Sequence, residues 1–242
     1  MVHLDSTEIA SWHRQILLLE AEGKVTRTFR RLDPDRQFAV IEALLAEAAE
    51  VGPQAVSVKR VAARAGVAVG SLYQYFARRD GMLDFAAQAC VGFLTECLDG
   101  YRPVMATLPL REGLLAYLGG GVEWSRAYAG LLSFFVRAAY QGLPAYADSM
   151  VRPVARSMRG LLAALIEAAG QRGELRAGVD VDTVTRLVHA FTIILADPAL
   201  VPHLNDYVLL FDTGHQPEAI FEAGVDFIMN AIGSRREGTD HG

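Results

Sequence analysis

Cysteine is almost absent from this chain, which has only Cys90 and Cys97 among its 242 residues. The two lie seven residues apart in a segment expected to form one helix, so roughly 10 Å separates them along its axis. That separation excludes a disulfide within the helix. We expect two buried thiols, with a redox sensor as the alternative.

Long hydrophobic runs are also lacking. No stretch of 18 apolar residues is free of charge, and the first residues do not have the pattern of a signal peptide. We therefore expect a cytoplasmic protein with no membrane partner. The scarcity of cysteine agrees with that compartment.

Motifs of catalysis and metal binding are missing as well. No Gly-rich phosphate loop follows a strand pattern, and the chain has no His-x-x-x-His, Cys-x-x-Cys or Gly-x-Ser-x-Gly. The histidines lack metal-ligand spacing: His3, His13, His189, His203, His215 and His241. These absences argue against an enzyme, and we expect neither a cofactor nor a metal.

Charge is present but unevenly distributed. The formal net charge is −5, yet residues 24–80 hold ten Lys and Arg against six Asp and Glu. The rest of the chain is correspondingly acidic. A basic segment on an acidic body is typical of a DNA-binding head with a separate effector body.

Residues 57–80 contain two short helical patterns separated by Gly66. Ser57 is a suitable N-cap for the first helix, 58–65, and Gly66 favours the left-handed conformation that ends it. The second helix begins at residue 68 or 69 and runs to 76. Two helices joined by a short Gly turn form a helix-turn-helix, whose second helix lies in the DNA major groove.

The outer face of that second helix carries small and hydrogen-bonding side chains. We expect base edges to be approached by Val69, Ser71 and Gln74, with Gly70 allowing close approach. The residues expected to hold phosphates are Ser57, Lys59, Tyr73, Tyr75 and Arg79, with Arg78 beside them. Arg60 is a further residue expected to contact DNA.

These residues carry a family resemblance. The chain resembles TetR-family transcriptional regulators without gaps over about 45 residues, in the pattern Ala62-x-x-Ala65-Gly66-Val67-x-x-Gly70-Ser71-Leu72-Tyr73-x-Tyr75-Phe76-x-x-Arg79-Asp80-x-Met82-Leu83. Val69 stands where a polar or basic residue is frequent, and Arg79 where Lys is usual. The resemblance implies an all-α homodimer that binds a double-stranded DNA operator and a small-molecule effector.

An extension precedes the head. A helix is expected over 6–22, ended by Gly23, because Ile9, Trp12, Ile16 and Leu19 form an apolar stripe. This helix is expected to pack either on its own subunit or on a dimer partner. The basic arm that follows, 24–31, is either a minor-groove contact or a solvated linker.

Asp33-Pro34 predicts the start of the first head helix and Gly52-Pro53 its end. A connecting helix is expected over 81–98. Helices follow over 104–118, 122–140 and 145–169, with Gly119-Gly120-Gly121 as a break and Pro153 as a kink.

Aromatic side chains are concentrated between 117 and 146, where most must form core. We expect some to line an apolar cavity between helices. The residues predicted to bind the effector are Trp124, Tyr128, Phe134, Arg137, Tyr140, Met150 and His189.

The C-terminal part predicts a helix over 182–196, an irregular stretch over 197–216, and a last helix over 216–232. Paired with their copies, the two helices form a four-helix dimer interface. Its predicted residues are Val184, Leu187, Phe191, Ile220, Phe221, Phe227 and Ile228.

The sequence thus predicts an all-α protein in three parts: an extension over 1–32, a helix-turn-helix DNA-binding domain over 33–80, and a helical ligand-binding and dimerisation domain over 81–242. The expected function is a ligand-responsive repressor. The alternative is an all-helical small-molecule carrier without operator binding, against which the basic and aromatic cluster near Tyr73 argues.

Overall fold

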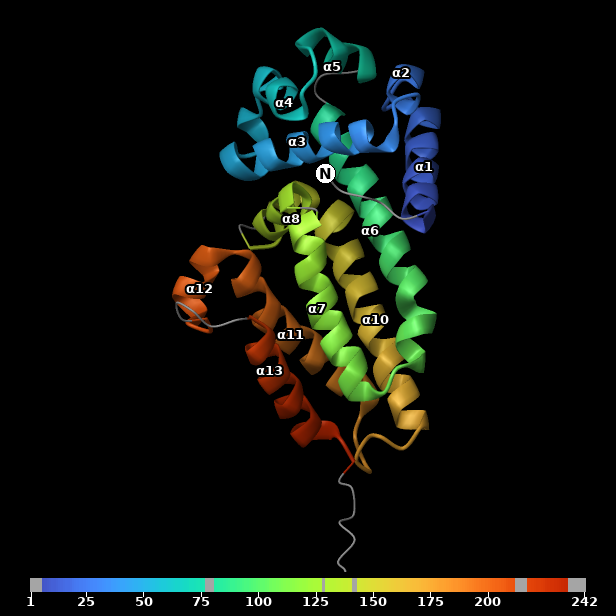
Figure 1. Cartoon of the computed structure of the whole chain (residues 1–242), viewed down its shortest axis with the longest axis vertical. Coiled ribbons are helices and arrows are strands. Elements are labelled where there is room, and N and C mark those ends of the chain that lie inside the picture. Colours follow the sequence, from blue (N-terminus) through green and yellow to red (C-terminus); the bar gives the residue numbers. More distant parts are fainter. Residues whose placement is uncertain (1–5, 77–80, 128, 141–142, 212–216, 235–242) are drawn as a thin grey trace, which may run out of the picture. The chain divides into compact units, whose positions relative to one another are not determined.

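The computed structural model describes residues 6–76, 81–127, 129–140, 143–211 and 217–234, and Figure 1 shows them as helices joined by short turns. Within these ranges no strand occurs beyond two isolated bridges, so the predicted all-α fold is confirmed. The helices are α1 (Ser6–Ala21), α2 (Arg27–Arg30), α3 (Pro34–Val51), α4 (Val58–Ala65), α5 (Val69–Tyr75), α6 (Met82–Thr107), α7 (Leu110–Ala127), α8 (Ala129–Tyr140), α9 (Pro144–Tyr146), α10 (Arg152–Gln171), α11 (Val181–Leu200), α12 (Pro202–Val208) and α13 (Pro217–Ile232).

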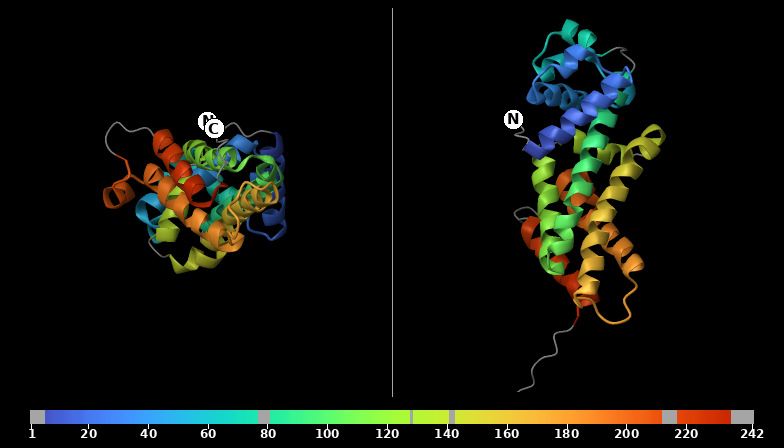
Figure 2. Two further views of the ribbon diagram at one scale, coloured as in Figure 1. Left: turned by 90° about the horizontal axis from the view of Figure 1, so that it is seen from below. Right: turned by 90° about the vertical axis from the view of Figure 1, so that its right-hand side faces the viewer.

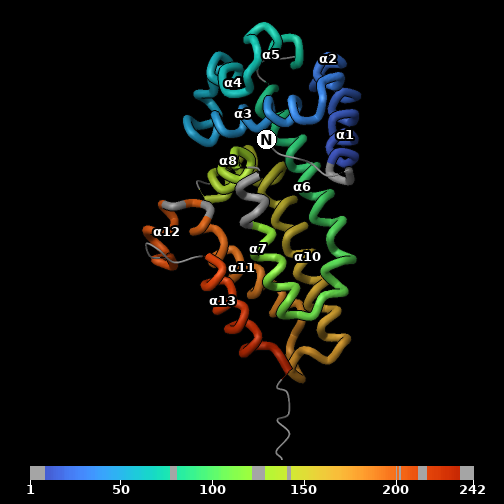
Figure 3. Tube along the Cα trace, viewed as in Figure 1, coloured from blue at the N-terminus to red at the C-terminus, as the bar shows by residue number. Residues whose placement is uncertain are grey.

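Two compact units divide the chain, and Figure 3 follows the order of their segments by colour. The first unit comprises Met1–Cys97 and Trp124–Arg156, and the second comprises Leu98–Glu123 and Ser157–Gly242. The first therefore holds the predicted head together with α8. The functional boundary expected at residue 80 is a separate division and stays a prediction.

The three helices predicted for the head are α3, α4 and α5, which follow α1 and α2 in the blue to turquoise part of Figure 2. The Asp33 carboxylate accepts from the N–H of Arg36 at 2.9 Å and caps α3, while Pro34 occupies its first turn. The inward stripe is buried as predicted: Phe38, Ile41, Leu44, Leu45 and Ala48 are at most 3% exposed. Local signals therefore fixed both ends of α3.

Helix α1 packs on its own chain. Trp12 is 0% exposed, and its ring centre lies 4.9 Å from that of Phe38 and 5.7 Å from that of Phe93. Its indole N–H donates to Gln37 Oε1 at 3.0 Å, so the buried ring satisfies its one polar atom. These contacts of α1 are with its own subunit, which was one of the two expected alternatives for this helix.

The predicted end of the connecting helix is wrong. A helix was expected over 81–98 and another from 104, but α6 continues to Thr107 with Pro103 inside it. Leu98 and Met105 lie seven residues apart, on one helix face, and both pack against the core of the second unit. Their burial offsets the hydrogen bond that Pro103 cannot donate.

The glycine triplet does not break a helix either, because α7 runs through Gly119, Gly120 and Gly121. Leu110, Leu114 and Leu118 are at most 1% exposed along one face of α7. Each buried leucine contributes about 1.5–3 kcal/mol, against about 1 kcal/mol lost per glycine. The single helix expected over 122–140 is instead divided between α7 and α8.

Pro153 was expected to kink a helix over 145–169. The distortion lies just before it, where Ala147–Val151 form a π-helical turn closed by a bond from the N–H of Arg152 to Ala147 O. A widened turn is one of the ways a helix accommodates a residue without an N–H. Helix α10 then runs on to Gln171.

The second unit has its own core, to which α7, α10, α11 and α13 contribute. Arg172, which follows α10, binds the chain at the end of α6. Its guanidinium donates to Ala106 O at 2.7 Å and to Leu108 O at 2.6 Å. Glu174, which pairs with Arg172, accepts from the N–H of Leu110 at 2.6 Å. One ion pair thus satisfies the end of α6 and the start of α7.

The stretch expected to be irregular, 197–216, contains regular structure. Helix α11 extends to Leu200 rather than ending at 196, and α12 follows it. Asn205 folds the chain after α12, since its amide oxygen accepts from the N–H groups of Leu210 and Phe211 at 3.0 and 2.8 Å. The last helix is confirmed as α13. Among the described helices, none has both the length and the hydropathy needed to cross a membrane.

Candidate functional site

The helix-turn-helix forms as the sequence predicts. The Ser57 hydroxyl accepts from the N–H of Arg60 at 3.5 Å at the start of α4, and Val61 and Ala62 are buried beneath it. At the end of α4, Gly66 has φ +66°, a left-handed conformation that a side chain would strain. The turn then leads directly into α5.

Helix α5 divides its residues between an inner and an outer face. Leu72 is 0% exposed, whereas Tyr73 is 51% and Val69 40% exposed. Gly70 and Gln74 are exposed beside them, and Ser71 is half-buried. The structure therefore brings together on one open face most of the residues predicted to approach DNA from α5.

Tyr75 departs from its predicted role as a phosphate ligand. Its side chain is 8% exposed, and its ring centre lies 5.8 Å from that of Phe29. Tyr75 thus belongs to the interior of the head. Arg78 and Arg79 lie outside the described residues.

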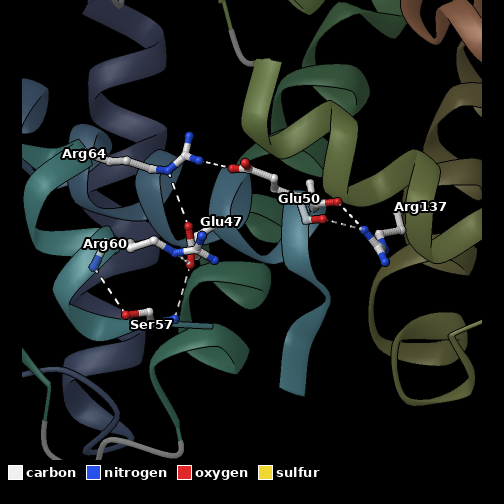
Figure 4. Close-up of polar contacts among 7 residues, drawn as sticks. Glu47, Glu50, Ser57, Arg60, Arg64 and Arg137 are labelled. Atoms are coloured by element: carbon white, nitrogen blue, oxygen red, sulfur yellow. Dashed lines mark hydrogen bonds and ion pairs between the residues drawn. The ribbon is translucent and has the colours of Figure 1, made fainter. Parts of the chain in front are cut away.

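Glu47 of α3 was not among the predicted site residues, yet its carboxylate binds the start of α4, the first helix of the helix-turn-helix. Its carboxylate is fully buried and accepts from the N–H of Ser57 at 3.3 Å and from Arg60 Nε at 2.7 Å. Arg64 pairs with Glu47 at 3.5 Å and also with Glu50, as Figure 4 shows. A buried carboxylate needs such partners. A charge within the apolar stripe of α3 was the available signal.

These contacts bear on the predicted DNA ligands of α4. Lys59 is exposed, while Arg60 is engaged by Glu47 and remains 51% exposed at its side chain. A DNA contact by Arg60 stays a prediction. Its bond to Glu47 also sets the orientation of α4 on α3.

Helix α8 is joined to α3 by two polar side chains. Glu42 of α3 accepts from the N–H groups of Gly130 and Leu131, the latter at 3.2 Å, and so caps α8. Arg137 donates to Ala49 O and, at 3.4 Å, to Glu50 O at the end of α3 (Figure 4). Both ends of the contact therefore use unpaired helix-terminal groups.

Gly130 permits that contact. A Cβ atom at this position would lie 2.8 Å from the backbone oxygen of Glu42 and 2.9 Å from Ala46 Cβ. Any side chain would force the two helices apart. Arg137, predicted as an effector ligand, is thus an interhelical tether in the first unit.

The contact between Glu42 and the start of α8 predicts that the stability of the fold depends on pH. Burial raises the pKa of the Glu42 carboxyl above its ordinary value of 4.5, although the two N–H groups oppose that shift. A raised folded-state pKa means that folding favours the protonated form, so stability falls as pH rises from about 4.5 through the folded-state pKa. Glu42→Gln keeps an acceptor oxygen but cannot ionise. We therefore expect this variant to lose the part of the decrease in stability with rising pH that Glu42 causes.

Urea denaturation at pH 4.5 to 8 measures this effect. Glu50→Gln is a control, because the Glu50 side chain is 57% exposed. An unchanged pH slope in Glu42→Gln would contradict the assignment.

The residues predicted to bind an effector are divided between the two units. Phe134 and Met150 are 0% exposed in the first unit, where the ring centre of Phe134 lies 5.1 Å from that of Tyr146. Tyr140 is 49% exposed, and His189 belongs to the second unit. The Trp124 side chain and Tyr128 lie outside the described residues.

A polar stripe lies on the inward face of α11. Thr185, His189 and Thr192 follow at i, i+4 and i+7, and Thr185 and Thr192 are 4% and 1% exposed. Among the described residues, neither Thr185 Oγ1 nor His189 Nδ1 has a hydrogen-bond partner. Burial, then the nearby Arg159, lowers the pKa of His189, which favours its neutral form.

Tyr117 of α7 adds a hydroxyl to this stripe. Burial raises the pKa of Tyr117, with Thr192 and Asp197 as further influences. Its buried hydroxyl interacts with Thr192, one of the two threonines of the stripe. The side chains of Tyr117, Thr185, His189 and Thr192 are therefore polar groups within an otherwise apolar core, and of these only His189 was predicted as an effector ligand.

The predicted dimer residues separate by exposure. Phe221 and Ile228 are each 4% exposed and belong to the chain's own core, which corrects their assignment to an interface. Leu187 and Phe227 are 64% and 65% exposed. Ile194, which was missed, is 46% exposed on the same face of α11 as Leu187. Val184, Phe191 and Ile220 are half-buried.

Two family models match the chain and together cover more than half of it. The model described as "Bacterial regulatory proteins, tetR family" matches residues 40–85, which include all of α4 and α5. The model described as "Transcriptional regulator SbtR-like, C-terminal domain" matches residues 111–209.

Known proteins agree with these matches. The HTH-type transcriptional regulator BetI 1 of Chromohalobacter salexigens is 26% identical over 182 residues, which are 66% of this chain and 90% of that protein. A TetR family regulator of Chloroflexus aurantiacus has a TM-score of 0.55 at 24% identity, covering 88% of this chain and 100% of that one.

SmeT, the repressor of the multidrug efflux pump SmeDEF of Stenotrophomonas maltophilia, has a TM-score of 0.58 at 17% identity, covering 83% of this chain and 91% of its own. These structures share the fold, and the family models match both the helix-turn-helix and the helical body. The chain belongs to the TetR family of transcriptional regulators and carries the DNA-binding helix-turn-helix of that family.

Proposed function

We propose that the protein is a ligand-responsive repressor that binds its operator as a homodimer. The outer face of α5 carries the proposal, because Val69, Gly70, Tyr73 and Gln74 are exposed while Leu72 anchors the helix. In each protomer this face enters a major groove. Tyr73 and Lys59 hold phosphates, and Gln74 approaches a base edge.

Selection of duplexes from a random library tests this function. Gln74→Ala is expected to relax preference at one base position by about 1–3 kcal/mol, since a Gln amide pairs bidentately with adenine. Gln54→Ala is the matched control, because Gln54 is exposed in the turn Pro53–Ala55, outside α5.

An unchanged preference at every position in Gln74→Ala rejects readout by that side chain. Failure of the unmodified chain to select any duplex rejects the repressor and favours a small-molecule carrier. The two proposals therefore give opposite results in one experiment.

The effector binds the second unit in this proposal. The surrounding core is apolar, and the unpartnered Thr185 Oγ1 and His189 Nδ1 need hydrogen-bond partners. An apolar molecule with one uncharged hydrogen-bonding group fits that combination. Release of ~100-fold repression requires about 2.7 kcal/mol of difference between its affinities for the two states.

Native mass spectrometry of the purified chain tests the effector role. A mass increase that Thr185→Val together with His189→Leu abolishes supports the proposed anchor. Retention of the same molecule by that variant rejects it.

Two arginines in the N-terminal extension, Arg27 and Arg31, form no ion pair with any described residue, and they lie outside this proposed effector site.

A further inference from the structure

The segment 24–31, which we call the clip, is fixed to the end of α5. Val25 pairs with Phe76 in an antiparallel bridge, and the N–H of Thr26 donates to Tyr75 O at 2.9 Å. The Thr26 hydroxyl donates to Gln74 O at 2.6 Å. The clip thus satisfies carbonyls that the end of a helix leaves unpaired.

Thr26 also begins α2. Its hydroxyl oxygen accepts from the N–H of Phe29 at 3.4 Å, so one side chain caps α2 and binds the end of α5. Gln37 closes the other end of α2 by donating to Phe29 O at 3.1 Å and Arg30 O at 3.0 Å. The clip is therefore held to the end of α5 through Thr26 and to α3 through Gln37.

Phe29 fixes the rotation of α2. It is 0% exposed, and its ring centre lies 5.6 Å from that of Phe76 and 5.5 Å from that of Phe85. At about 100° per residue, positions two before and two after Phe29 point away from it. Those positions are Arg27 and Arg31, and both are exposed.

The basic residues of the clip are divided by their partners. Arg30 pairs with Glu20, and Lys24 pairs with Glu22 at 2.5 Å. Arg27 and Arg31 form no ion pair with any described residue. They are four residues apart on one face, where two like charges destabilise a helix by about 0.2–0.5 kcal/mol. An anionic partner removes that repulsion.

We propose that the clip is a second DNA-contact element, in which Arg27 and Arg31 bind phosphates beside the base pairs approached by α5. Arg27 directly follows Thr26, whose hydroxyl binds the residue proposed to read a base, Gln74. A duplex held by α5 therefore presents its backbone close to this pair. Guanidinium groups suit such phosphates.

This inference rests on the proposed contacts of α5, but it concerns residues outside the matched TetR model, which begins at residue 40. It also changes the expectation for the arm. Because the clip is bound to α5 through Thr26, its arginines contact the backbone, and insertion of a free arm into the minor groove is not needed.

The test compares variants of the full chain by fluorescence anisotropy on one labelled duplex, selected by the unmodified chain, between 50 and 300 mM salt. Arg27→Ala with Arg31→Ala is expected to weaken binding roughly 10- to 100-fold at 150 mM salt. The slope of log K against log salt should fall by about two per bound protomer. Base preference should not change.

Arg14→Ala with Arg152→Ala is the matched control, since it removes two exposed, ion-paired arginines from the same unit. It should change affinity less than threefold and leave the slope unchanged. Thr26→Val, which keeps every charge, should weaken binding several-fold without altering the slope. An unchanged slope in the clip variant, or an equal change in the control, overturns the inference.

The outcomes separate this inference from the proposed function. If the unmodified chain selects a duplex and the clip variant binds it equally well, only the clip assignment fails. If the unmodified chain selects none, both fail. Circular dichroism melting of the variants identifies any loss that comes from unfolding.

Discussion

Leu187→Asp together with Phe227→Asp is expected to give a monomer that binds operator DNA on the order of 100- to 10,000-fold more weakly. Both side chains are about two-thirds exposed in the single chain. Phe227 packs against Phe191, with ring centres 5.5 Å apart, so the exposed face of α11 is continuous with that of α13. A second copy would bury this face.

The size of the effect has two causes. A carboxylate placed in an apolar interface remains uncompensated, and the symmetry of a homodimer introduces each substitution twice. Once the protomers separate, the two heads no longer bind the duplex as one bivalent unit. The 10²- to 10⁴-fold gain in DNA affinity that linkage of two heads provides is then lost. The fold of each chain should persist because neither side chain belongs to its core.

Sedimentation equilibrium measures the first effect and anisotropy the second. Tyr207→Asp with Leu209→Asp is the matched control, because these residues are 86% and 77% exposed in the same unit but lie at the end of α12. That control should remain a dimer with unchanged affinity. A dimeric Leu187→Asp, Phe227→Asp variant would place the interface elsewhere.

Phe29→Ala is expected to lower the free energy of unfolding of the head by about 3–5 kcal/mol. Phe29 is fully buried and lies within 6 Å, centre to centre, of the rings of Tyr75, Phe76 and Phe85. Removing its ring leaves a cavity that rigid aromatic neighbours fill poorly. It also takes away the residue that holds α2 against the end of α5.

Urea denaturation followed by Trp12 fluorescence measures this loss, because Trp12 is buried in the same unit. The chain has two tryptophans, so Trp124→Phe in every protein compared leaves Trp12 as the sole reporter. Tyr73→Ala, which removes an exposed ring from α5, should cost less than about 1 kcal/mol. Equal losses in the two variants would show that Phe29 is not part of the stabilising core.

The helix-turn-helix was predictable because its boundaries are local. Asp33 and Ser57 cap the helices that follow them, and Gly52 and Gly66 end those that precede them. The exposed positions of Tyr73 and Gln74 on α5 followed from helical periodicity, whereas that of Tyr75 did not. Such signals require no knowledge of distant parts of the chain.

The errors arose where distant burial decided the outcome. Residues 99–103 were left outside the predicted helices and the glycine triplet at 119–121 was taken as a break, yet the leucines and Met105 on the buried faces of α6 and α7 keep those helices continuous. Tyr75 was placed at DNA because its partner, Phe29, is far away in the sequence. For the same reason neither the bond from Arg137 to the end of α3 nor the buried Glu47 was foreseen.

Hydroxyl-radical footprinting of the selected duplex, bound by the full chain, tests the central claim most directly. A dimer that presents α5 and the clip twice should protect two stretches of backbone whose centres lie about 34 Å, one DNA turn, apart. Each stretch should become shorter at one end in the Arg27→Ala, Arg31→Ala variant. A single protected stretch, or cleavage equal to that of free DNA, would contradict the account.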